Sequence, residues 1–181
     1  MAAEKRLMTE AEMDGAIKAI AEQIVEEGFG NAVLIGIKTR GVPMAHWLAR
    51  HLAAITRKTP KVGELDINLY RDDLSEVGEQ PVVHKTEILF NLHEAGVILV
   101  DDVLYTGRTI RAAMDALIDF GRPKFIKLAV LVDRGWRELP IQAEFVGKAV
   151  KTVADEVVKV MFEETDGRNE VLLKEHFSKR A

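Results

Sequence analysis

The sequence predicts an α/β protein with a central parallel sheet flanked by helices and a smaller antiparallel part. Two stretches, residues 32–56 and 96–121, each contain an apolar segment, a short polar loop and an amphipathic helix. Strands and helices that alternate in this way form parallel sheets. After residue 140 the apolar segments are short and close together, as antiparallel strands are.

The first predicted element is a helix from about residue 9 to residue 27. Thr9 and Glu12 have the spacing of a capping box, in which each side chain accepts a hydrogen bond from a backbone N–H group at the start of a helix. Gly28 and Gly30 end the helix. Its apolar face consists of Met13, Ile17, Ile20, Ile24 and Val25.

Residues 32–37 are expected to form a buried strand, followed by the loop 38–41 and an amphipathic helix. Lys38 and Arg40 bring positive charge to the N-terminus of that helix, where the helix dipole also attracts anions. Gly41 allows a close approach of the backbone. The loop fits a diphosphate, although basic loops of this kind are also found as ordinary solvated turns.

Residues 62–70 alternate apolar and polar side chains, which predicts a strand with one solvated face near an edge of the sheet. Residues 71–81 are polar and rich in turn-forming residues, and residues 82–89 can return as the second strand of a hairpin. A long polar segment in a compact enzyme is often a lid over the site, and otherwise it is a plain surface loop.

Residues 97–109 form the centre of the predicted sheet. The run 97–100 is β-branched and aliphatic, which is typical of a strand buried on both faces, and we expect it to end at Asp101 and Asp102. Beyond the acids the apolar spacing becomes that of a helix, which Gly121 ends. The apolar helix positions are Ile110, Met114, Leu117 and Ile118.

The loop between this strand and this helix has the features of a phosphate site. Backbone N–H groups and the positive end of a helix dipole meet there, Gly107 allows close approach, and Thr106 and Thr109 add hydroxyl donors. Asp101 and Asp102 would repel a phosphate, but they suit the hydroxyls of a sugar or a divalent cation. A phosphorylated ribose satisfies both halves, and the alternative is an ordinary turn with an aspartate cap.

The rest of the chain adds one long strand and several short ones. Residues 125–132 form an apolar run that ends at the charged turn 133–140. Residues 148–156 form a polar connection. Short strands are predicted at residues 143–146, 157–162 and 171–173. There is no internal repeat and no linker, so a single domain is expected.

The composition agrees with one soluble domain, because 48% of the 181 residues are hydrophobic. The absence of cysteine excludes disulfides, thiolate nucleophiles and cysteine-ligated zinc. No apolar run has the length of a membrane span and no signal peptide is recognisable, so a cytoplasmic protein without a membrane partner is expected. The net charge of -4 argues against a globally basic nucleic-acid-binding protein and leaves room for a local basic face.

Several other chemistries lack the motifs that they need. The 5 histidines have no spacing typical of metal ligands. The sequence also lacks the nucleophile elbow of hydrolases, the glycine fingerprint of dinucleotide-binding proteins and the P-loop. Those functions therefore have no support.

Residues 97–109 resemble the 5-phosphoribosyl 1-pyrophosphate (PRPP) signature of the type I phosphoribosyltransferases. Further motifs occur in order at residues 36–41, 69–74, 121–123 and 128–140, and together they make nearly the whole chain similar to the PyrR family. The resemblance implies a type I phosphoribosyltransferase fold, with a central parallel sheet flanked by helices, a flexible loop hairpin and a small hood. It implies a single domain over residues 1–181, with the core at about 9–135, the flexible loop at about 71–83 and the hood at about 136–165.

In function, the resemblance implies a uracil phosphoribosyltransferase, which converts uracil and PRPP to UMP and pyrophosphate with Mg²⁺ on the diphosphate. It also implies UMP-dependent binding of the leader mRNA of pyrimidine genes, which promotes transcription termination. A homo-oligomer, dimer or higher, is expected. The alternatives are a salvage phosphoribosyltransferase, for uracil or another base, without RNA regulation, and an RNA-binding regulator with a nucleotide-sensing site and little turnover.

The resemblance also implies roles for individual residues. Asp101 and Asp102 would hold the ribose hydroxyls and help to position Mg²⁺, and Arg71 would belong to the loop that closes over the reaction. Arg134 and the backbone near Val157 would recognise uracil. The expected pyrophosphate residues are Lys38, Thr39, Arg40 and Gly41. The expected residues around the 5′-phosphate are Val103, Leu104, Tyr105, Thr106, Gly107, Arg108 and Thr109.

Two segments of the expected hood depart from the family pattern. Trp136 stands where the family usually has histidine after Asp-Arg-Gly. Residues 147–153 read Gly-Lys-Ala-Val-Lys-Thr-Val, where the family usually has Gly-Lys-Asn-x-Pro-Thr-Ser. These departures bear on the choice of base and on the rate.

Charge bears on the expected RNA binding. An RNA-binding face needs clustered Lys and Arg to contact phosphates. In this family the first helix contributes to a basic face of the dimer, whereas here it carries Lys18 among several acidic residues. RNA binding would therefore depend on Lys148, Lys151 and Arg137.

Overall fold

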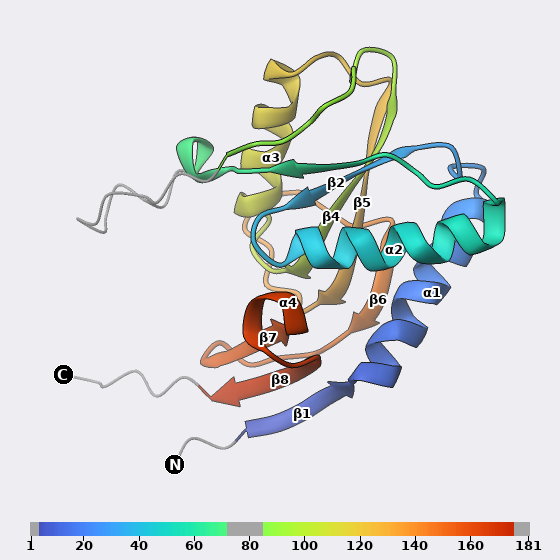
Figure 1. Ribbon diagram of the computed structural model, residues 1–181. Coiled ribbons are helices and arrows are strands. Elements are labelled where there is room, and N and C mark those ends of the chain that lie inside the picture. Colours follow the sequence, from blue (N-terminus) through green and yellow to red (C-terminus); the bar gives the residue numbers. More distant parts are fainter. Residues whose placement is uncertain (1–3, 72–84, 176–181) are drawn as a thin grey trace.

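The computed structural model describes residues 4–71 and 85–175, and its main element is a five-stranded parallel sheet (Figure 1). All neighbouring strands in it are parallel. Their order is β3 (Val62–Leu65), β2 (Val33–Ile37), β4 (Gly96–Leu104), β5 (Phe125–Asp133) and β6 (Phe145–Ala149). The predictions that residues 97–100 form a central strand and that the strand beginning at residue 62 lies at an edge are thereby confirmed.

Strand β4 is longer than predicted and includes both acids. We expected it to end at Asp101 and Asp102, but it continues to Leu104. The reason is its equally long neighbour β5, with which it stays paired as far as Leu104 and Asp133. The two aspartates therefore project from a paired strand rather than from a loop.

The strand predicted over residues 62–70 is formed only in its first half. β3 ends at Leu65, and Asn68–Tyr70 form a 3₁₀ turn. Oδ1 of Asp66 accepts a hydrogen bond from the backbone N–H of Asn68 at 2.9 Å, a local bond that competes with strand pairing. The chain thus leaves the sheet just before Arg71.

The predicted lid and hairpin fall mostly on residues that the structure does not describe. Of the lid at residues 71–81, only Arg71 is described. Residues 85–89 are the described part of the predicted return strand, and they contain one antiparallel bridge, between Glu64 and Glu87, instead of a strand.

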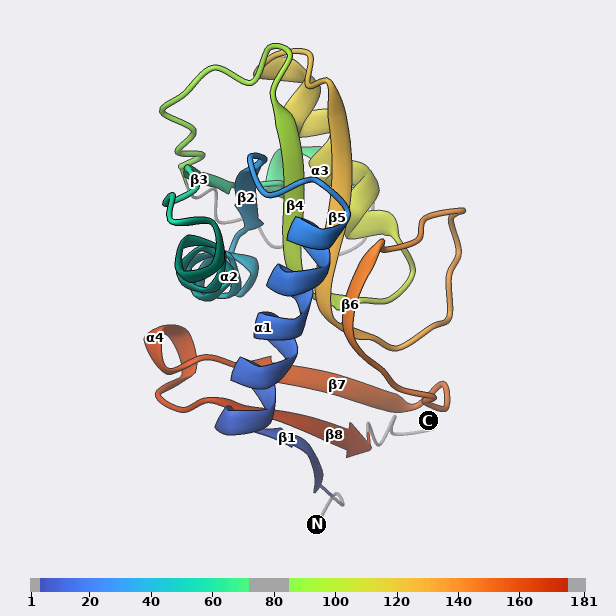
Figure 2. The same cartoon turned by 90° about the vertical axis from the view of Figure 1, so that its right-hand side faces the viewer.

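Helices α1 (Glu10–Glu26) and α2 (Gly41–Thr56) pack on one face of the sheet, and α3 (Arg108–Asp119) covers the other (Figures 1 and 2). The predicted capping box is present at the start of α1. The backbone N–H of Glu12 donates to Oγ1 of Thr9 at 3.3 Å, and the backbone N–H of Thr9 donates to Oε2 of Glu12 at 2.7 Å. The helix therefore begins where the sequence predicts.

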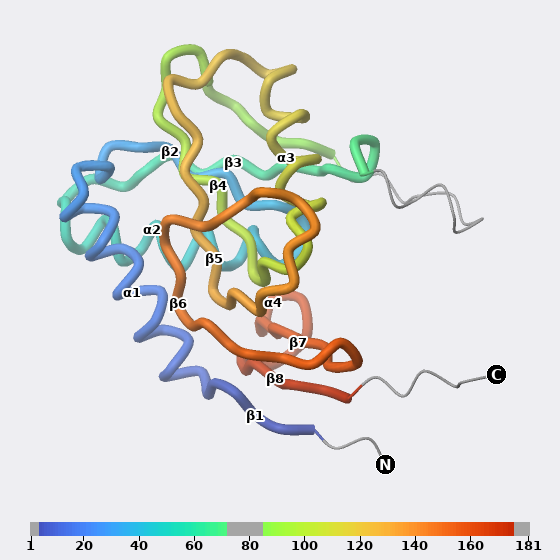
Figure 3. Tube along the Cα trace, turned by 180° about the vertical axis from the view of Figure 1, so that it is seen from behind, coloured from blue at the N-terminus to red at the C-terminus, as the bar shows by residue number. Residues whose placement is uncertain are grey.

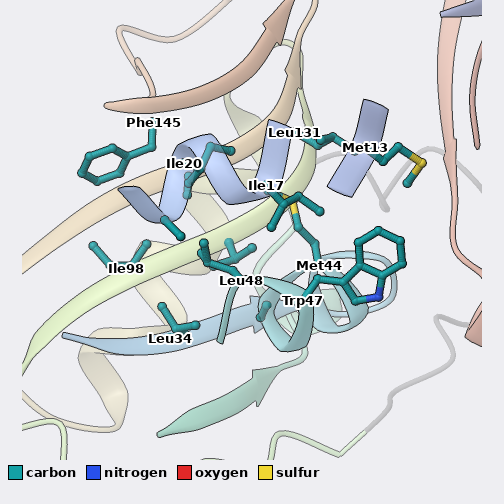
Figure 4. Close-up of a cluster of buried hydrophobic side chains, with 14 of the residues drawn as sticks. Met13, Ile17, Ile20, Leu34, Met44, Trp47, Leu48, Ile98, Leu131 and Phe145 are labelled. Carbon is teal, nitrogen blue, oxygen red and sulfur yellow. The ribbon is translucent and has the colours of Figure 1, made fainter. Parts of the chain in front are cut away.

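Two clusters of buried side chains fix the helices to the sheet. Because successive strand residues point to opposite faces, Ile98 packs with α1 and α2, whereas Leu99 packs with α3. Burial of each large apolar side chain stabilises the fold by roughly 1.5–3 kcal/mol. Figure 4 shows the first cluster, with Met13, Ile17, Ile20, Leu34, Met44, Trp47, Leu48, Ile98, Leu131 and Phe145 labelled.

A second, three-stranded antiparallel sheet lies beyond the carboxyl ends of β4 and β5 (Figures 1 and 2). Its strands, in order, are β1 (Glu4–Thr9), β8 (Glu170–Glu175) and β7 (Glu156–Met161). The short helix α4 (Glu163–Asp166) joins β7 to β8. This smaller sheet takes residues from outside as well as inside the range 136–165 expected for the hood.

The short segments predicted late in the chain divide between the two sheets. Residues 157–162 and 171–173 match β7 and β8, whereas residues 143–146 overlap β6 of the parallel sheet. The sequence does not predict β1, because in this strand only Met8 is buried and no apolar alternation is visible.

Candidate active site

The acid pair of β4 and the basic loop after β2 line one cavity of about 330 Å³ at the carboxyl edge of the parallel sheet. The sequence assigned several of its lining residues to a site: Lys38, Thr39, Arg40, Arg71, Asp101, Asp102, Val103 and Thr109. Residues that the sequence did not assign are Ile37, Asp66, Ile67 and Asn68. The latter come from the ends of β2 and β3, which the parallel order of strands brings to the same edge.

The surroundings of the two aspartates raise the pKa of both carboxyls. Asp101 is only 6% exposed, and its Oδ1 accepts a hydrogen bond from the backbone N–H of Asp102 at 2.9 Å. Burial, and then the charge of Asp102, raises the pKa of Asp101 well above its usual value. Burial also raises the pKa of Asp102. A cation or hydroxyl donors bound to the pair would favour its ionised form.

A second cavity of about 350 Å³ lies at the N-terminus of α3. Gly107 is the N-cap of this helix and has a φ of 92°, a conformation that side chains other than glycine rarely adopt. The cavity is lined by Arg71, Val103, Leu104, Tyr105, Thr106, Gly107, Arg108, Thr109, Ile110 and Glu138. All residues expected around a 5′-phosphate therefore lie together.

The two cavities adjoin each other. Arg71, Val103 and Thr109 line both. An elongated ligand with phosphate groups at its two ends and a sugar between them can therefore contact the helix N-terminus, the acid pair and the basic loop at once.

The connection from β5 to β6 supports the loop before α3 (Figure 3), and the sequence reasoning missed most of this support. The backbone N–H groups of Glu138 and Leu139 donate to the carbonyl of Thr106 at 2.9 and 3.1 Å. Nη1 of Arg137 donates to the carbonyl of Tyr105 at 2.9 Å. The charge of the turn 133–140 was a signal, but only Arg134 in it was assigned to the site.

Both basic residues of the loop after β2 are paired with carboxylates. Nζ of Lys38 lies 3.1 Å from Oε2 of Glu64. Nε of Arg40 donates to Oδ2 of Asp166 at 3.0 Å, and Nη2 of Arg40 donates to Oδ1 at 2.7 Å. Sequence reasoning missed Asp166, because it lies 126 positions from Arg40 and carries no motif.

Gly41 lets helix α2 begin directly against β4. A Cβ atom at this position would lie 2.4 Å from the carbonyl oxygen of Val100, closer than atoms can approach. The expected close approach is therefore present, and it is to the backbone of the central strand.

Of the two regions expected to recognise a base, the structure brings only Arg134 to a cavity next to the phosphate loop. Arg134 is 6% exposed, and its guanidinium carbon lies 3.9 Å from the ring centroid of Tyr105. It lines a third cavity, of about 570 Å³, together with Trp136. Val157 lies on β7, is 38% exposed and does not line that cavity.

Two kinds of feature are absent from the described part of the chain. Within residues 4–71 and 85–175, no group of three or more His, Cys, Asp and Glu side chains is arranged to hold a metal ion. Over the same ranges, no helix combines the length and the apolar character that crossing a membrane requires.

Comparison with known sequences identifies the family. The model of the phosphoribosyl transferase domain matches residues 6–161. The chain is 57% identical over 169 residues to the bifunctional protein PyrR of Thermus aquaticus, a match that covers 92% of this chain and 93% of the relative. It is 50% identical over 177 residues to the bifunctional protein PyrR of Clostridioides difficile strain 630, covering 97% of this chain and 100% of the relative.

Solved structures share the fold. A hypoxanthine phosphoribosyltransferase of Trypanosoma cruzi has a TM-score of 0.72 at 20% identity, with 96% of this chain and 98% of that chain covered. A hypoxanthine-guanine phosphoribosyltransferase of Bacillus anthracis has a TM-score of 0.71 at 20% identity, with 94% and 97% covered. The predicted type I phosphoribosyltransferase fold is confirmed, and the chain belongs to the phosphoribosyl transferase domain family and, within it, to the PyrR proteins.

Proposed function

We propose that this chain is a uracil phosphoribosyltransferase, which converts uracil and PRPP to UMP and pyrophosphate, and a UMP-dependent regulator that binds the leader mRNA of pyrimidine genes. The observation that carries the enzymatic part is the pair of adjoining cavities, which combine a phosphate loop, an acid pair and a basic loop. The relatives named bifunctional protein PyrR support the combination of two roles.

PRPP fits the two cavities along its length. The 5′-phosphate would accept hydrogen bonds from the loop 105–109 at the N-terminus of α3, and the diphosphate would bind the loop 38–41. Between them, Asp101 and Asp102 would accept hydrogen bonds from the ribose hydroxyls. Arg71 lines both cavities, so its charge acts on both phosphate groups.

The reaction breaks the bond from carbon one of the ribose to pyrophosphate, which leaves with the bonding electrons. It forms a bond from the same carbon to a uracil nitrogen, whose proton is released to the departing pyrophosphate or to solvent. Carbon one gains positive charge as pyrophosphate leaves, and the ionised form of the acid pair stabilises that charge. Lys38 and Arg40 would donate hydrogen bonds to the leaving group with the N–H groups that their carboxylate partners do not use. Positioning, more than proton transfer, would carry the rate.

The proposed cofactor is Mg²⁺. Among the described residues Asp101 and Asp102 are available as oxygen ligands and no cluster of three ligands exists, which fits a cation held for the most part by substrate oxygens. When bound, Mg²⁺ would neutralise the diphosphate and make it a better leaving group.

Uracil recognition is proposed for Arg134 and the backbone near Val157, with the smaller sheet as the hood. Nη2 of Arg134 is buried and has no hydrogen-bond partner among the described residues. A buried donor of this kind is costly unless a ligand accepts from it, and a uracil carbonyl is a suitable acceptor. Trp136 donates from its indole Nε1 to the carbonyl of Thr152 at 2.9 Å, so its ring forms a wall of the same cavity.

The contacts in the chain restrict the RNA part of the proposal. Arg137 donates to Tyr105 and Asp133 within the site, and Nζ of Lys148 donates to the carbonyl of Leu7 at 2.9 Å. Of the three cations expected to serve RNA, Lys148 and Lys151 are exposed and Arg137 is partly buried. Together with the acidic first helix, this favours a salvage enzyme without RNA regulation as the second candidate. A cytoplasmic location and a homo-oligomer belong to the proposal in either case.

A panel of nucleobases incubated with PRPP and Mg²⁺ tests the enzyme, with nucleotide formation as the readout. We expect UMP from uracil and little product from hypoxanthine or guanine, and the reverse preference would contradict the assignment.

A filter-binding titration of the pyrimidine-gene leader RNA, with and without UMP at fixed salt, tests the regulator. Binding that UMP strengthens, relative to a scrambled RNA, is expected, and equal binding of both RNAs would leave the salvage enzyme alone.

A further inference from the structure

We propose that Asp166 is a positioning residue for the diphosphate end of the site, which holds the guanidinium of Arg40 so that its free edge faces an anion in the cavity of Asp101 and Asp102. The inference rests on the proposed function, since that function assigns Arg40 to the diphosphate of PRPP. It adds to the site a residue from α4, the short helix that joins β7 to β8 of the smaller sheet.

The contact between Asp166 and Arg40 is a two-point ion pair. Nε and Nη2 of Arg40 donate to Oδ2 and Oδ1 of Asp166, at 3.0 and 2.7 Å. A guanidinium has about five N–H groups on a rigid plane, and a pair of this kind uses two of them along one edge. The remaining N–H groups stay available to a second anion.

Arg40 lines the cavity and Asp166 does not. The carboxylate therefore contacts the arginine from outside the cavity lining. Asp166 and, more weakly, Asp102 both raise the pKa of Arg40, so the guanidinium lies within the electrostatic influence of both carboxylates. In this arrangement Asp166 orients the arginine, and an anion in the cavity can bind the N–H groups that Asp166 leaves available.

Asp166 is itself held in place by other donors. Its Oδ2 accepts hydrogen bonds from the backbone N–H of Phe162 at 3.2 Å and from the hydroxyl of Thr165 at 2.8 Å. The side chain of Asp166 is 10% exposed, against 34% for that of Arg40. The carboxylate is thus the fixed partner, and the arginine is the one that it orients.

The ion pair joins two parts of the fold that the sequence separates. Asp166 is the last residue of α4, between β7 and β8, whereas Arg40 precedes the first residue of α2. Since α4 joins β7 to β8 of the smaller sheet, the ion pair is a contact between that part of the fold and the loop 38–41.

If Asp166 competed with the ligand for Arg40, its removal would change the affinity for anions in the opposite direction. If the carboxylate competed with the diphosphate for Arg40, its removal would tighten the binding of anions. If it positions Arg40, its removal weakens that binding, because the guanidinium then samples many orientations. The sign of the change separates the two roles.

The experiment measures the Kd of PRPP and of pyrophosphate by titration calorimetry with Mg²⁺, for the wild type and three variants. Asp166→Asn should raise both Kd values about tenfold or more, and Asp166→Glu, which keeps the carboxylate, should raise them less. Glu163→Gln is the matched control, because it removes the same charge from an exposed position of the same short helix, and its Kd values should equal those of the wild type. Thermal unfolding confirms that each variant is folded.

A double-mutant cycle with Arg40→Ala tests whether Asp166 acts through the arginine. In that background Asp166→Asn should change neither Kd, whereas an equal effect in both backgrounds would overturn the proposal. Unchanged or lower Kd values for Asp166→Asn alone would also overturn it. If Asp166→Asn does not fold, the Kd values of Asp166→Glu decide instead. Higher Kd values than those of the wild type support the proposal, and unchanged or lower values overturn it.

Binding of pyrophosphate does not require turnover, so the test remains valid even if the nucleobase panel contradicts the proposed function. Steady-state kinetics add a second readout. We expect Asp166→Asn to raise the KM for PRPP much more than the KM for uracil, whereas a merely structural role would move the melting temperature and leave both KM values unchanged.

Discussion

The guanidinium of Arg134 stacks on the ring of Tyr105, with 3.9 Å between its central carbon and the ring centroid. The backbone N–H of Arg134 also donates to the carbonyl of Leu104 at 3.1 Å. Tyr105 belongs to the loop proposed for the 5′-phosphate, and Arg134 is proposed to recognise the base. The residues for the two ends of a nucleotide are therefore in direct contact, so a substitution of one should alter ligand binding at the other.

Arg134→Lys should raise the KM for uracil about tenfold or more, because lysine cannot reproduce the planar stack or the buried donor geometry. A smaller rise in the KM for PRPP is expected through Tyr105. Initial rates measured over both substrate concentrations check this. An unchanged KM for uracil would remove Arg134 from the base site.

Asp101→Asn and Asp102→Asn should each lower kcat about 100-fold or more, because the amide cannot provide the negative charge that the forming cation needs. Circular dichroism should match that of the wild type, since asparagine has nearly the same shape. Turnover at the wild-type rate in both variants would show that the acid pair is not part of the reaction.

The stability of the protein should depend on pH through Asp101. The pKa of Asp101 is raised in the folded state, so as pH rises the unfolded chain loses the proton of this carboxyl before the folded protein does. The folded state therefore loses stability as pH rises from about 4 towards the folded pKa. Asp101→Asn removes this loss, so its melting temperature should exceed that of the wild type at pH 8. Melting curves from pH 4 to pH 8 at fixed ionic strength check the trend. A variant that melts below the wild type throughout this range would contradict it.

Asp166 should give the opposite dependence. The hydrogen bond from Arg40 lowers the pKa of Asp166 to about 2, from an ordinary value of 3.8. The stabilisation of the folded state by ionised Asp166 is then fully present above about pH 4 and is lost as pH falls through about 2. Urea unfolding should show Asp166→Asn to be about 1–2 kcal/mol less stable at pH 7, with allowance for the partly exposed Arg40, and this difference should shrink at acid pH. A difference that persists unchanged at pH 2 would count against the ion pair.

Gly107→Ala should impair the phosphate loop. An alanine with a φ of 92° is strained by about 1–2 kcal/mol, and its Cβ would lie 3.2 Å from Cβ of Ile141. We expect a lower melting temperature and a higher KM for PRPP. Gly15→Ala in α1 is the control, because a Cβ there meets nothing within 4 Å and alanine favours a helix by about 0.5–1 kcal/mol. If both variants behave alike, the conformation of Gly107 has no special role.

The parts of the fold that the sequence predicts are those with a local cause. The capping box of Thr9 and Glu12 depends on residues three positions apart, and the strand, loop and helix of residues 97–119 follow one another directly. The same holds for the adjoining cavities, since parallel strands bring their carboxyl ends, and so the loops after β2 and β4, to one edge.

What the sequence does not predict depends on distant partners. Strand β1 has little apolar pattern of its own and exists because β8 pairs with it, as Lys5 does with Leu173. The extension of β4 past Asp101 depends on the length of β5, and the partner of Arg40 lies in α4. None of these partners can be identified from local propensity, because the interaction joins segments far apart along the chain.

The pairing of β1 with β8 limits the order in which the two sheets can fold during synthesis. Synthesis proceeds from the N-terminus, and domains begin to fold as they emerge. All strands of the parallel sheet are complete once Ala149 has been added, but Glu4–Thr9 must wait for Glu170–Glu175 before they can pair. The nascent chain therefore carries an unpaired strand edge until Glu170–Glu175 have been added, and Arg40 acquires its carboxylate partner only when Asp166 has been added.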